Sequence, residues 1–220
     1  MPSLVLLGYS GLLAAVAGFV NSVALLVWVY PVGNLTALTT KAGMHSTNPL
    51  LYQGRMITAI VVGFLAGTAA AGAALAAVRT ATGPRHAAVL AAEAALLLAA
   101  AGIEQPIVRA LCAAACGLQN GMTSNFPGMP IRTTHFTGTI TDLGLLLGRS
   151  HRDGIDTWKA TVLATTVVLF VGGAAAGVLI GARIGDHALI PPAVTCVAIA
   201  AAIVWHDRWI QLRKSLALYR

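Results

Sequence analysis

The sequence predicts an all-helical protein that crosses a membrane several times. Hydrophobic residues make up 57% of its 220 residues, and charged residues make up only 10%. Soluble globular domains contain roughly 25% charged residues, and disordered chains have low hydrophobicity, so both classes are excluded. Long apolar stretches between short polar segments favour spanning helices over barrel strands. A similarity between the two halves of the chain predicts how these helices are arranged.

Six apolar stretches follow one another along the chain. They are residues 4–30, 56–78, 87–103, 107–122, 160–182 and 188–205. About 20 apolar residues cross the hydrocarbon core of a bilayer as a helix. No segment between them is large enough for a soluble domain, so residues 1–220 form one membrane domain. Residues 206–220 place Trp209, Leu212 and Leu216 on one helical face beside Arg213 and Lys214, which predicts a basic amphipathic tail on anionic lipid.

Lysine and arginine gather in the segments that lie on the same side of the membrane as the N-terminus. Arg149, Arg152 and Lys159 are examples. Because cytoplasmic loops carry the excess of these residues, both termini are expected in the cytoplasm. The net charge of +7 is therefore mainly a topology signal. Scattered basic residues do not form the continuous stripe of a nucleic-acid-binding surface, so we expect no nucleic-acid partner.

The two halves of the chain resemble each other. The matching blocks are 33–43 with 138–148 and 67–72 with 172–177, both 105 positions apart, and 18–21 with 117–120, 99 positions apart. Each copy, 4–103 and 104–205, contains three spans, and an odd number forces the second copy to insert upside down. The sequence thus predicts a 3+3 inverted repeat, an arrangement common in transporters. The alternative is a chance similarity between alanine- and glycine-rich helices.

Two short segments, 33–43 and 138–148, each begin and end at glycine. As helices they are roughly 16 Å long, about half of the hydrocarbon core. We expect two half-helices whose N-termini face each other near the midplane of the membrane, where unpaired N–H groups favour an anionic or polar group. The alternative is a pair of amphipathic helices at the two membrane surfaces.

Polar side chains accompany these two segments. The predicted substrate-binding residues are Asn21, Gly33, Asn34, Thr36, Asn120, Arg132, Thr137, Gly138, Thr139 and Thr141. Asn21 and Asn120 precede the two segments at matching positions. An amide within a membrane needs a partner, so each asparagine either braces the backbone at a helix break or lines the pathway.

These motifs carry a family resemblance. Residues 117–120, followed by 132–139, resemble the signature of the YoaK-like family of bacterial membrane proteins, which is filed under a label for domains of unknown function. Residues 18–21 through 33–34 resemble its first signature, and the resemblance covers nearly the whole chain. Val32 and Asp142 stand where relatives carry a threonine and a basic residue. The resemblance implies a multi-spanning membrane protein and names no substrate.

Two carboxylates are candidates for proton coupling. Glu93 lies within the third span, and Asp142 lies within the second half-helix. Carboxylates inside a membrane are costly and mark proton or ion pathways by default. For Glu93 the alternative is that its side chain reaches the interface; for Asp142 it is an ion pair with Arg132 or His135.

The leading hypothesis is a permease for a small anionic or polar solute. One rival is a membrane-embedded enzyme that uses His135 and Asp142; another is an oligomeric scaffold without transport. Glycines spaced four apart let helices approach closely, within the bundle or between copies of the chain. They are Gly63 and Gly67, and Gly173, Gly177 and Gly181. Cys112 and Cys116 lack histidines at ligand spacing, so we expect no metal site, and no motif indicates a cofactor.

Overall fold

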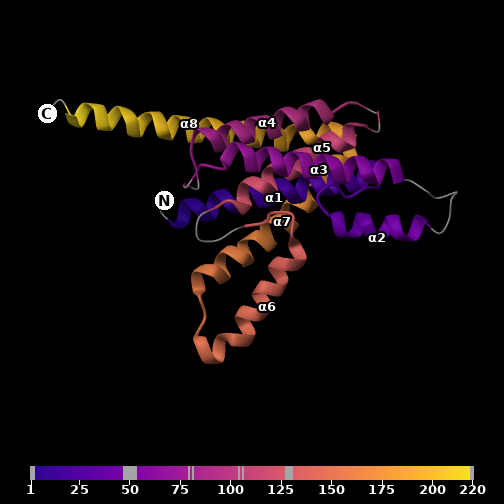
Figure 1. Ribbon diagram of the computed structural model, residues 1–220, viewed down its shortest axis with the longest axis horizontal. Helices are drawn as coiled ribbons and strands as arrows, with labels where there is room; N and C mark the ends of the chain where they lie inside the picture. The colour runs from indigo at the N-terminus through magenta and orange to yellow at the C-terminus, as the bar shows by residue number, and fades with distance from the viewer. Residues whose placement is uncertain are drawn as a thin grey trace.

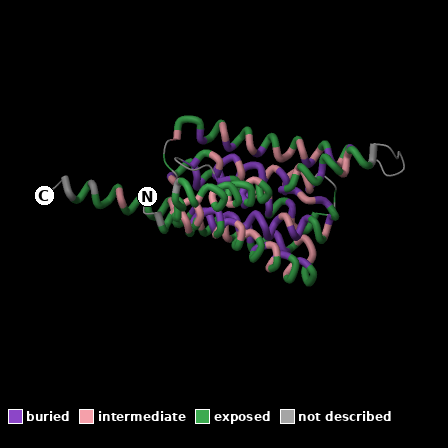
Figure 2. Tube along the Cα trace, turned by 90° about the horizontal axis from the view of Figure 1, so that it is seen from below, coloured by how far each residue is buried: buried purple, intermediate pink, exposed green. Residues whose placement is uncertain are grey.

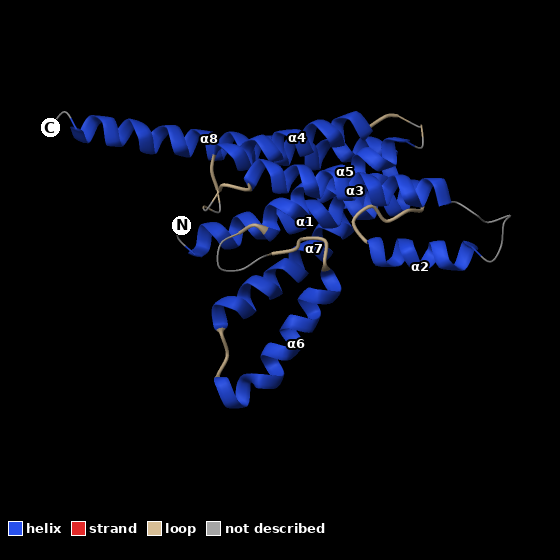
Figure 3. Cartoon of the chain, in the orientation of Figure 1, coloured by secondary structure: helices blue, strands red, loops and turns tan. Residues whose placement is uncertain are grey.

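The structure is a computed structural model that describes residues 3–46, 54–78, 80, 82–103, 105, 107–126 and 131–218. Among these residues the regular secondary structure is entirely helical, with loops between the helices and no strand (Figure 3). The elements are α1 (Ser3–Trp28), α2 (Leu35–Ser46), α3 (Gly54–Leu75), α4 (Pro84–Ala100), α5 (Ile107–Ser124), α6 (Phe136–Asp153), α7 (Thr157–Ile184), η2 (Gly185–Leu189) and α8 (Ile190–Leu218).

Each of the six predicted apolar stretches forms a helix, and their locations are confirmed to within a few residues at most boundaries. Among the described residues, three helical stretches are long and apolar enough to cross a membrane: Leu4–Trp28, Gly54–Leu75 and Thr157–Arg213. The last of these contains both α7 and most of α8. The helix α4 has 17 residues and is shorter than these stretches, whereas α5 carries Arg109 in its first turn. The two predicted copies of the repeat meet between residues 103 and 104, and residue 104 lies outside the described residues.

Many apolar side chains of these helices face outward. Val62, Leu65, Val168 and Leu179 are all more than half exposed. In the apolar windows of α3 and of α7–α8, only 22% of the residues are buried within the protein. Soluble proteins rarely expose so continuous an apolar surface, whereas lipid accepts it. The exposed apolar side chains therefore agree with helices that span a membrane.

Both predicted half-helices are helical, but their bounds differ from the prediction. The helix α2 starts at Leu35, two residues after Gly33, and has 12 residues. In contrast, α6 has 18 residues, so the predicted length of 138–148 is wrong. It begins before Gly138 and continues through Gly148, because no residue there stops the hydrogen-bonded turns. It ends at Gly154, whose φ of 75° suits glycine.

Two helix pairs form the centre of the fold: α1 packs along α7, and α3 packs along α5. Glycines allow these helices to meet backbone against backbone. A methyl group added at Gly18 of α1 would collide with the carbonyl oxygen of Phe170 in α7. In the other pair, one added at Gly67 of α3 would collide with the carbonyl oxygen of Ala114 in α5. Figure 2 shows the buried residues concentrated between these central helices.

The glycine faces predicted for helix contacts are occupied within the chain. Gly63 and Gly67 face α5, whereas Gly173, Gly177 and Gly181 face α1. A homo-oligomer would therefore need a different surface. The remaining helices α4 and α8 pack against each other, and α4 also packs against α5.

Two parts of the chain extend away from this bundle in Figure 1. The helix α6 and the first half of α7 form an arm joined at residues 154–156. The helix α8 runs without interruption from Ile190 to Leu218, so the predicted tail is a straight extension of the last span. Trp205 is 76% exposed and Leu216 is 68% exposed on this extension. Residues 219 and 220 of the predicted tail lie outside the described residues.

The glycine contacts predict opposite effects for two substitutions in α3. Alanine has a higher helix propensity than glycine by about 1 kcal/mol, so Gly72→Ala, where no atom lies within 4 Å of the new methyl group, should raise the thermal unfolding temperature slightly. Gly67→Ala should lower it, because the methyl group pushes α3 away from α5 at a cost of about 1–3 kcal/mol. Thermal unfolding of the detergent-purified variants measures both. Equal behaviour of the two variants would contradict the described packing.

Candidate functional site

The segment that leads into α2 is held by Asn21 of α1. The Asn21 Oδ1 atom accepts a hydrogen bond of 3.0 Å from the backbone N–H of Gly33. A Cβ atom at position 33 would lie 3.4 Å from the same oxygen and 3.3 Å from Thr134 Cγ2. Asn21 therefore braces the break between α1 and α2, and it also lines a cavity.

The N-terminus of α2 is closed by its own cap. The Asn34 Oδ1 atom accepts a hydrogen bond of 3.1 Å from the N–H of Ala37, as N-cap asparagines do. Asn34 thus satisfies one of the unpaired N–H groups that this helix would otherwise offer to a ligand.

The segment that leads into α6 is held by Gln119 of α5. The Gln119 Nε2 atom donates to the Leu13 carbonyl oxygen of α1 at 2.7 Å and to Thr133 Oγ1 at 2.9 Å. The Ile131 N–H donates to the Thr123 carbonyl oxygen at 3.1 Å. Gln119, Thr123 and Thr133 are all buried. These bonds fix where α6 begins relative to both α1 and α5.

The N-terminus of α6 has no side-chain cap. His135 occupies the N-cap position and makes no capping hydrogen bond with its side chain. Its imidazole ring lies over Gly138, where a Cβ atom would collide with the ring. Gly138 therefore makes room for His135 and does not mark the start of the helix. Because the first N–H groups of a helix lack intrahelical partners, this end favours an anionic or polar ligand more than the capped end of α2 does.

A cavity of about 410 Å³ lies between the two helix N-termini. It is lined by Gly33, Asn34, Leu35, Thr36, Phe64, Asn120, Arg132, Thr134, His135, Phe136 and Thr137. The α2 end, the α6 end and one residue of α5 thus meet at one place, although they lie far apart in the sequence. Arg132 is exposed and contributes a positive charge beside the uncapped helix end.

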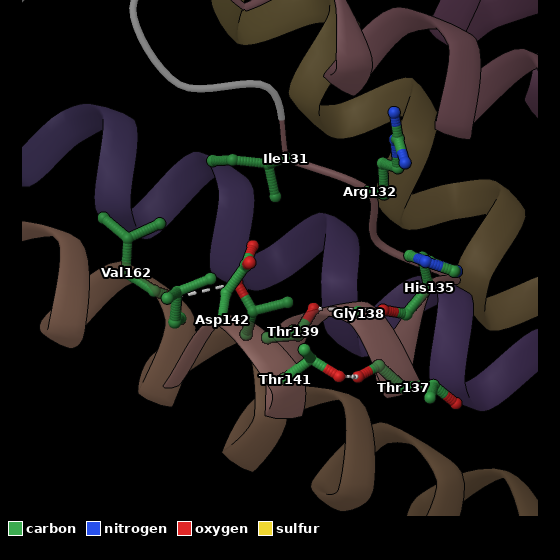
Figure 4. Close-up of a pocket in the computed structure, with 11 residues that line it drawn as sticks. Ile131, Arg132, His135, Thr137, Gly138, Thr139, Thr141, Asp142 and Val162 are labelled. Carbon is green, nitrogen blue, oxygen red and sulfur yellow. Dashed lines mark hydrogen bonds between the residues drawn. The ribbon is translucent and has the colours of Figure 1, made fainter. Parts of the chain in front are cut away.

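Two further cavities adjoin this one and share lining residues with it. One, of about 310 Å³, contains Asn21 and lies against Phe170 and Ala174 of α7. The other, of about 440 Å³, lies between the start of α6 and the first half of α7 and contains Arg132, His135, Thr139, Thr141 and Asp142 (Figure 4). The three cavities therefore surround the first turns of α6.

The hydroxyl groups of Thr139 and Thr141 bond to their own helix. Thr139 Oγ1 donates to the His135 carbonyl oxygen at 3.1 Å, and Thr141 Oγ1 donates to the Thr137 carbonyl oxygen at 2.9 Å. Both dashed bonds are visible in Figure 4. Their oxygen lone pairs remain available, so these two residues offer acceptors more than donors. Neither lines the cavity between α2 and α6.

Asn120 differs from its counterpart Asn21. Its Oδ1 atom is buried and has no hydrogen-bond partner, although the residue lines the cavity between the helix ends. A buried amide oxygen without a partner costs about 1–3 kcal/mol and calls for an explanation, such as water or ligand. The two asparagines, which the sequence treats as equivalent, therefore have different environments.

All of the predicted substrate-binding residues line one of the three cavities, but no single cavity contains them all. Thr134, Phe64, Phe136 and Phe170 also line these cavities and are absent from the prediction. Thr134 lies within residues 132–139, which carry the family resemblance. The phenylalanines carried no sequence signal, because an aromatic residue in an apolar span is expected to pack against its neighbours.

The two proton-coupling candidates lie in different places. Asp142 lines the cavity shown in Figure 4 but forms no ion pair with Arg132 or His135. Glu93 is buried within α4 at 2% exposure and lines none of the three cavities. It therefore does not reach a surface. Among the described residues, no three histidine, cysteine or carboxylate side chains gather in a way that would hold a metal ion.

Comparisons with known proteins place the chain in a family without assigning an activity. No curated protein and no solved structure matches it. The family model described as "Protein of unknown function (DUF1275)" matches residues 10–202, a range that runs from α1 into α8 and includes every residue of the three cavities. The chain therefore belongs to the DUF1275 family, whose function is unknown.

Proposed function

We propose that this protein is a membrane permease for a small anionic or polar solute, which binds in the cavity between the N-termini of α2 and α6. The observation that carries the proposal is the convergence of the uncapped α6 end, Arg132 and the unpartnered Asn120 on one cavity of about 410 Å³. The volume suits a small metabolite, since ligand pockets typically measure about 300–1,000 Å³.

The chemistry of the lining defines the solute class. The α6 N–H groups and the Arg132 guanidinium are donors that bind a carboxylate, phosphate or similar acceptor group. Within the part of the chain that the structure describes, no carboxylate lines the same cavity, so an anion meets no repulsion from these residues. Phe64 and Phe136 supply apolar walls for the remainder of the solute.

We further propose that the chain is an inverted repeat of residues 4–103 and 104–205, with six spans. The two central helix pairs support this, because exchanging α1 with α5 and α3 with α7 converts one pair into the other. The helices α1 and α5 run in opposite directions in Figure 1, as inversion requires.

The glycine contacts give this repeat a register. Gly18 meets Phe170 as Gly117 meets Phe64. Likewise Gly173 meets Ala15 as Gly67 meets Ala114. Equivalent positions in α1 and α5 are then 99 residues apart, as in the match between 18–21 and 117–120. Equivalent positions in α3 and α7 are 106 residues apart, whereas the sequence match gives 105. Two copies in opposite orientations would let α2 and α6 enter the cavity from opposite sides, as in transporters whose broken helices meet at the midplane.

The location follows from the charge distribution. We propose that the protein lies in the bacterial inner membrane. Both termini are in the cytoplasm, because arginine and lysine gather in the segments on that side. The protruding end of α8, with Arg208 and Arg213, then lies on the cytoplasmic side, where the membrane surface is anionic.

The direct test is solute flux into proteoliposomes that contain the purified protein. A panel of small carboxylates, phosphate, sulfate and neutral polar metabolites should include at least one solute that enters faster than into empty vesicles. Arg132→Gln should reduce that flux roughly 10-fold or more, since a hydrogen bond to a charged group contributes about 1.5–3 kcal/mol. Arg149→Gln, near the far end of the same helix, should leave it unchanged.

Two results would contradict the permease, and a third would contradict the location of its site. Absence of flux for every panel member by a folded protein would favour the scaffold. Chemical conversion of a solute without transport would favour an enzyme, in which case His135 and Asp142, which line one cavity, become its first candidates. Equal flux in both arginine variants would place the site elsewhere.

The two asparagines provide a matched pair of variants. Asn120→Leu should abolish the stabilisation that a bound solute gives, yet leave the stability of the empty protein unchanged or higher, because an unpartnered buried oxygen is removed. Asn21→Leu should destabilise the empty protein by about 1 kcal/mol, because the Gly33 N–H loses its acceptor. Thermal unfolding with and without solute measures both, and similar profiles for the two variants would disprove their division of roles.

A further inference from the structure

A groove between α1 and α8 lies apart from the cavities around α6. It encloses about 440 Å³. Within the described part of the chain, no residue lines both this groove and one of those cavities. Val5 and Leu12, which line it, are 51% and 43% exposed. The groove therefore opens to the surroundings of the bundle, which for helices that span a membrane are lipid.

The α1 wall of the groove contains a gap at Gly8. Val5, Gly8 and Leu12 follow one another at spacings of three and four residues, which place them on one helical face. No atom lies within 4 Å of a methyl group added at Gly8. Tyr9, which also lines the groove, is buried and closes its inner side. A narrow chain can therefore lie against the backbone of α1 between two larger side chains.

The α8 wall changes from apolar to polar along its length. It presents Ile199, Ala202 and Ile203, followed by His206 and Asp207, again at helical spacings of three and four residues. His206 and Asp207 directly follow the last apolar stretch of the sequence. The groove therefore has one apolar end and one polar end.

The two walls run in opposite directions. The start of α1 and the end of α8 lie at the same end of the molecule in Figure 1, so Val5 belongs to the polar end of the groove and Leu12 to the apolar end. From Val5 to Leu12 the helix rises roughly 10 Å at 1.5 Å per residue. A groove with this polarity fits an amphiphile whose apolar chain points into the membrane and whose polar head stays at the surface.

Tryptophan side chains mark the depth of the polar end. Trp205 and Trp209 flank His206 and Asp207 in the sequence and are 76% and 44% exposed. Tryptophan gathers at the boundary between membrane and water, level with the lipid head groups. The polar end of the groove is therefore at the depth of the head groups, which makes a membrane lipid the fitting amphiphile.

Asp207 supplies a negative charge to this polar end. It is half-buried and, among the described side chains, forms no ion pair. A carboxylate that is partly withdrawn from water is stabilised by a cation that donates hydrogen bonds to it. A primary ammonium group has three N–H donors, whereas a quaternary ammonium group has none. Asp207 therefore favours a lipid with a primary ammonium.

Positive groups adjoin the same end. Thr82, which lines the groove, directly precedes Gly83, the N-cap residue of α4. This helix start has no side-chain cap, and Arg85 in its first turn is exposed. Backbone N–H groups at a helix start and an arginine both favour a phosphate group. Both charges of a zwitterionic phospholipid thus have partners beside the groove.

We propose that the groove between α1 and α8 binds a phospholipid whose head group carries a primary ammonium. One acyl chain lies against Gly8 and Ala202, the ammonium donates to Asp207, and the phosphate lies toward the start of α4. The lipid joins α1 to α8, whose main partners in the bundle are α7 and α4. This site rests on the chain spanning a membrane and is independent of the permease.

Native mass spectrometry of the detergent-purified, delipidated protein tests the site. Phosphatidylethanolamine and phosphatidylcholine with identical acyl chains are added in competition, with phosphatidylglycerol as the anionic lipid. Phosphatidylethanolamine should be retained roughly 10-fold more than phosphatidylcholine, the scale of a hydrogen bond to a charged group. Equal retention of these two lipids, or preferential retention of phosphatidylglycerol, would overturn the proposal.

Two carboxylate variants test the head-group contact. Asp207→Asn should abolish the preference for ethanolamine over choline, because the amide oxygen carries no charge. Asp186→Asn is the matched control, since Asp186 is also half-buried but lies in η2, before the opposite end of α8. This control should retain the preference. A preference that survives Asp207→Asn would show that the ammonium binds elsewhere and would overturn the site.

Two glycine variants test the acyl-chain contact. Gly8→Leu fills the gap and should reduce retention of phosphatidylethanolamine roughly 10-fold or more, because at least two methylene groups lose their buried place. Gly72→Leu in α3, where an added Cβ atom likewise meets no atom within 4 Å, should leave retention unchanged. Equal retention by both variants, or replacement of the lipid by a second copy of the chain, would overturn the proposal. Because no solute is present, failure of the permease leaves these outcomes unaffected.

Discussion

The contact of helix backbones at glycine is the constraint on which the rest of this structure depends. In lipid, apolar side chains provide little hydrophobic force between helices, so association relies on close van der Waals contact. Gly18 and Gly173 provide that contact between α1 and α7, and Gly67 and Gly117 provide it between α3 and α5. The outward side chains are then left for the surrounding lipid.

Close packing of these pairs also fixes the loops that build the cavities. Asn21 and Gln119 both project from helices of the central pairs, and they hold the backbone that precedes α2 and α6 respectively. Because α1 and α5 cannot slide along their partners without a backbone collision, the starts of α2 and α6 are held at a constant separation. The cavity between them is a property of the bundle and needs no direct contact between α2 and α6.

Sequence patterns predicted much of this architecture because apolar length and small-residue spacing are local properties. The helices and the glycine contacts follow from such patterns. The approach of residues 33–36 to 132–137, which line one cavity, was expected from the proposed inverted repeat and not from local patterns. The length of α6 did not follow from local patterns, because the helix continues through glycines until Gly154 permits a stop. The difference between Asn21 and Asn120 was also hidden, since it depends on which backbone N–H lies opposite each amide.

The uninterrupted helix α8 has a mechanical consequence. Its 29 residues measure roughly 43 Å at 1.5 Å per residue, which is longer than the hydrocarbon core. With no glycine or proline after its first turn, the helix behaves as a stiff rod that is held by the bundle at one end and free at the other. A small tilt of the held end, for instance when the neighbouring α4 shifts, becomes a larger displacement of the free end.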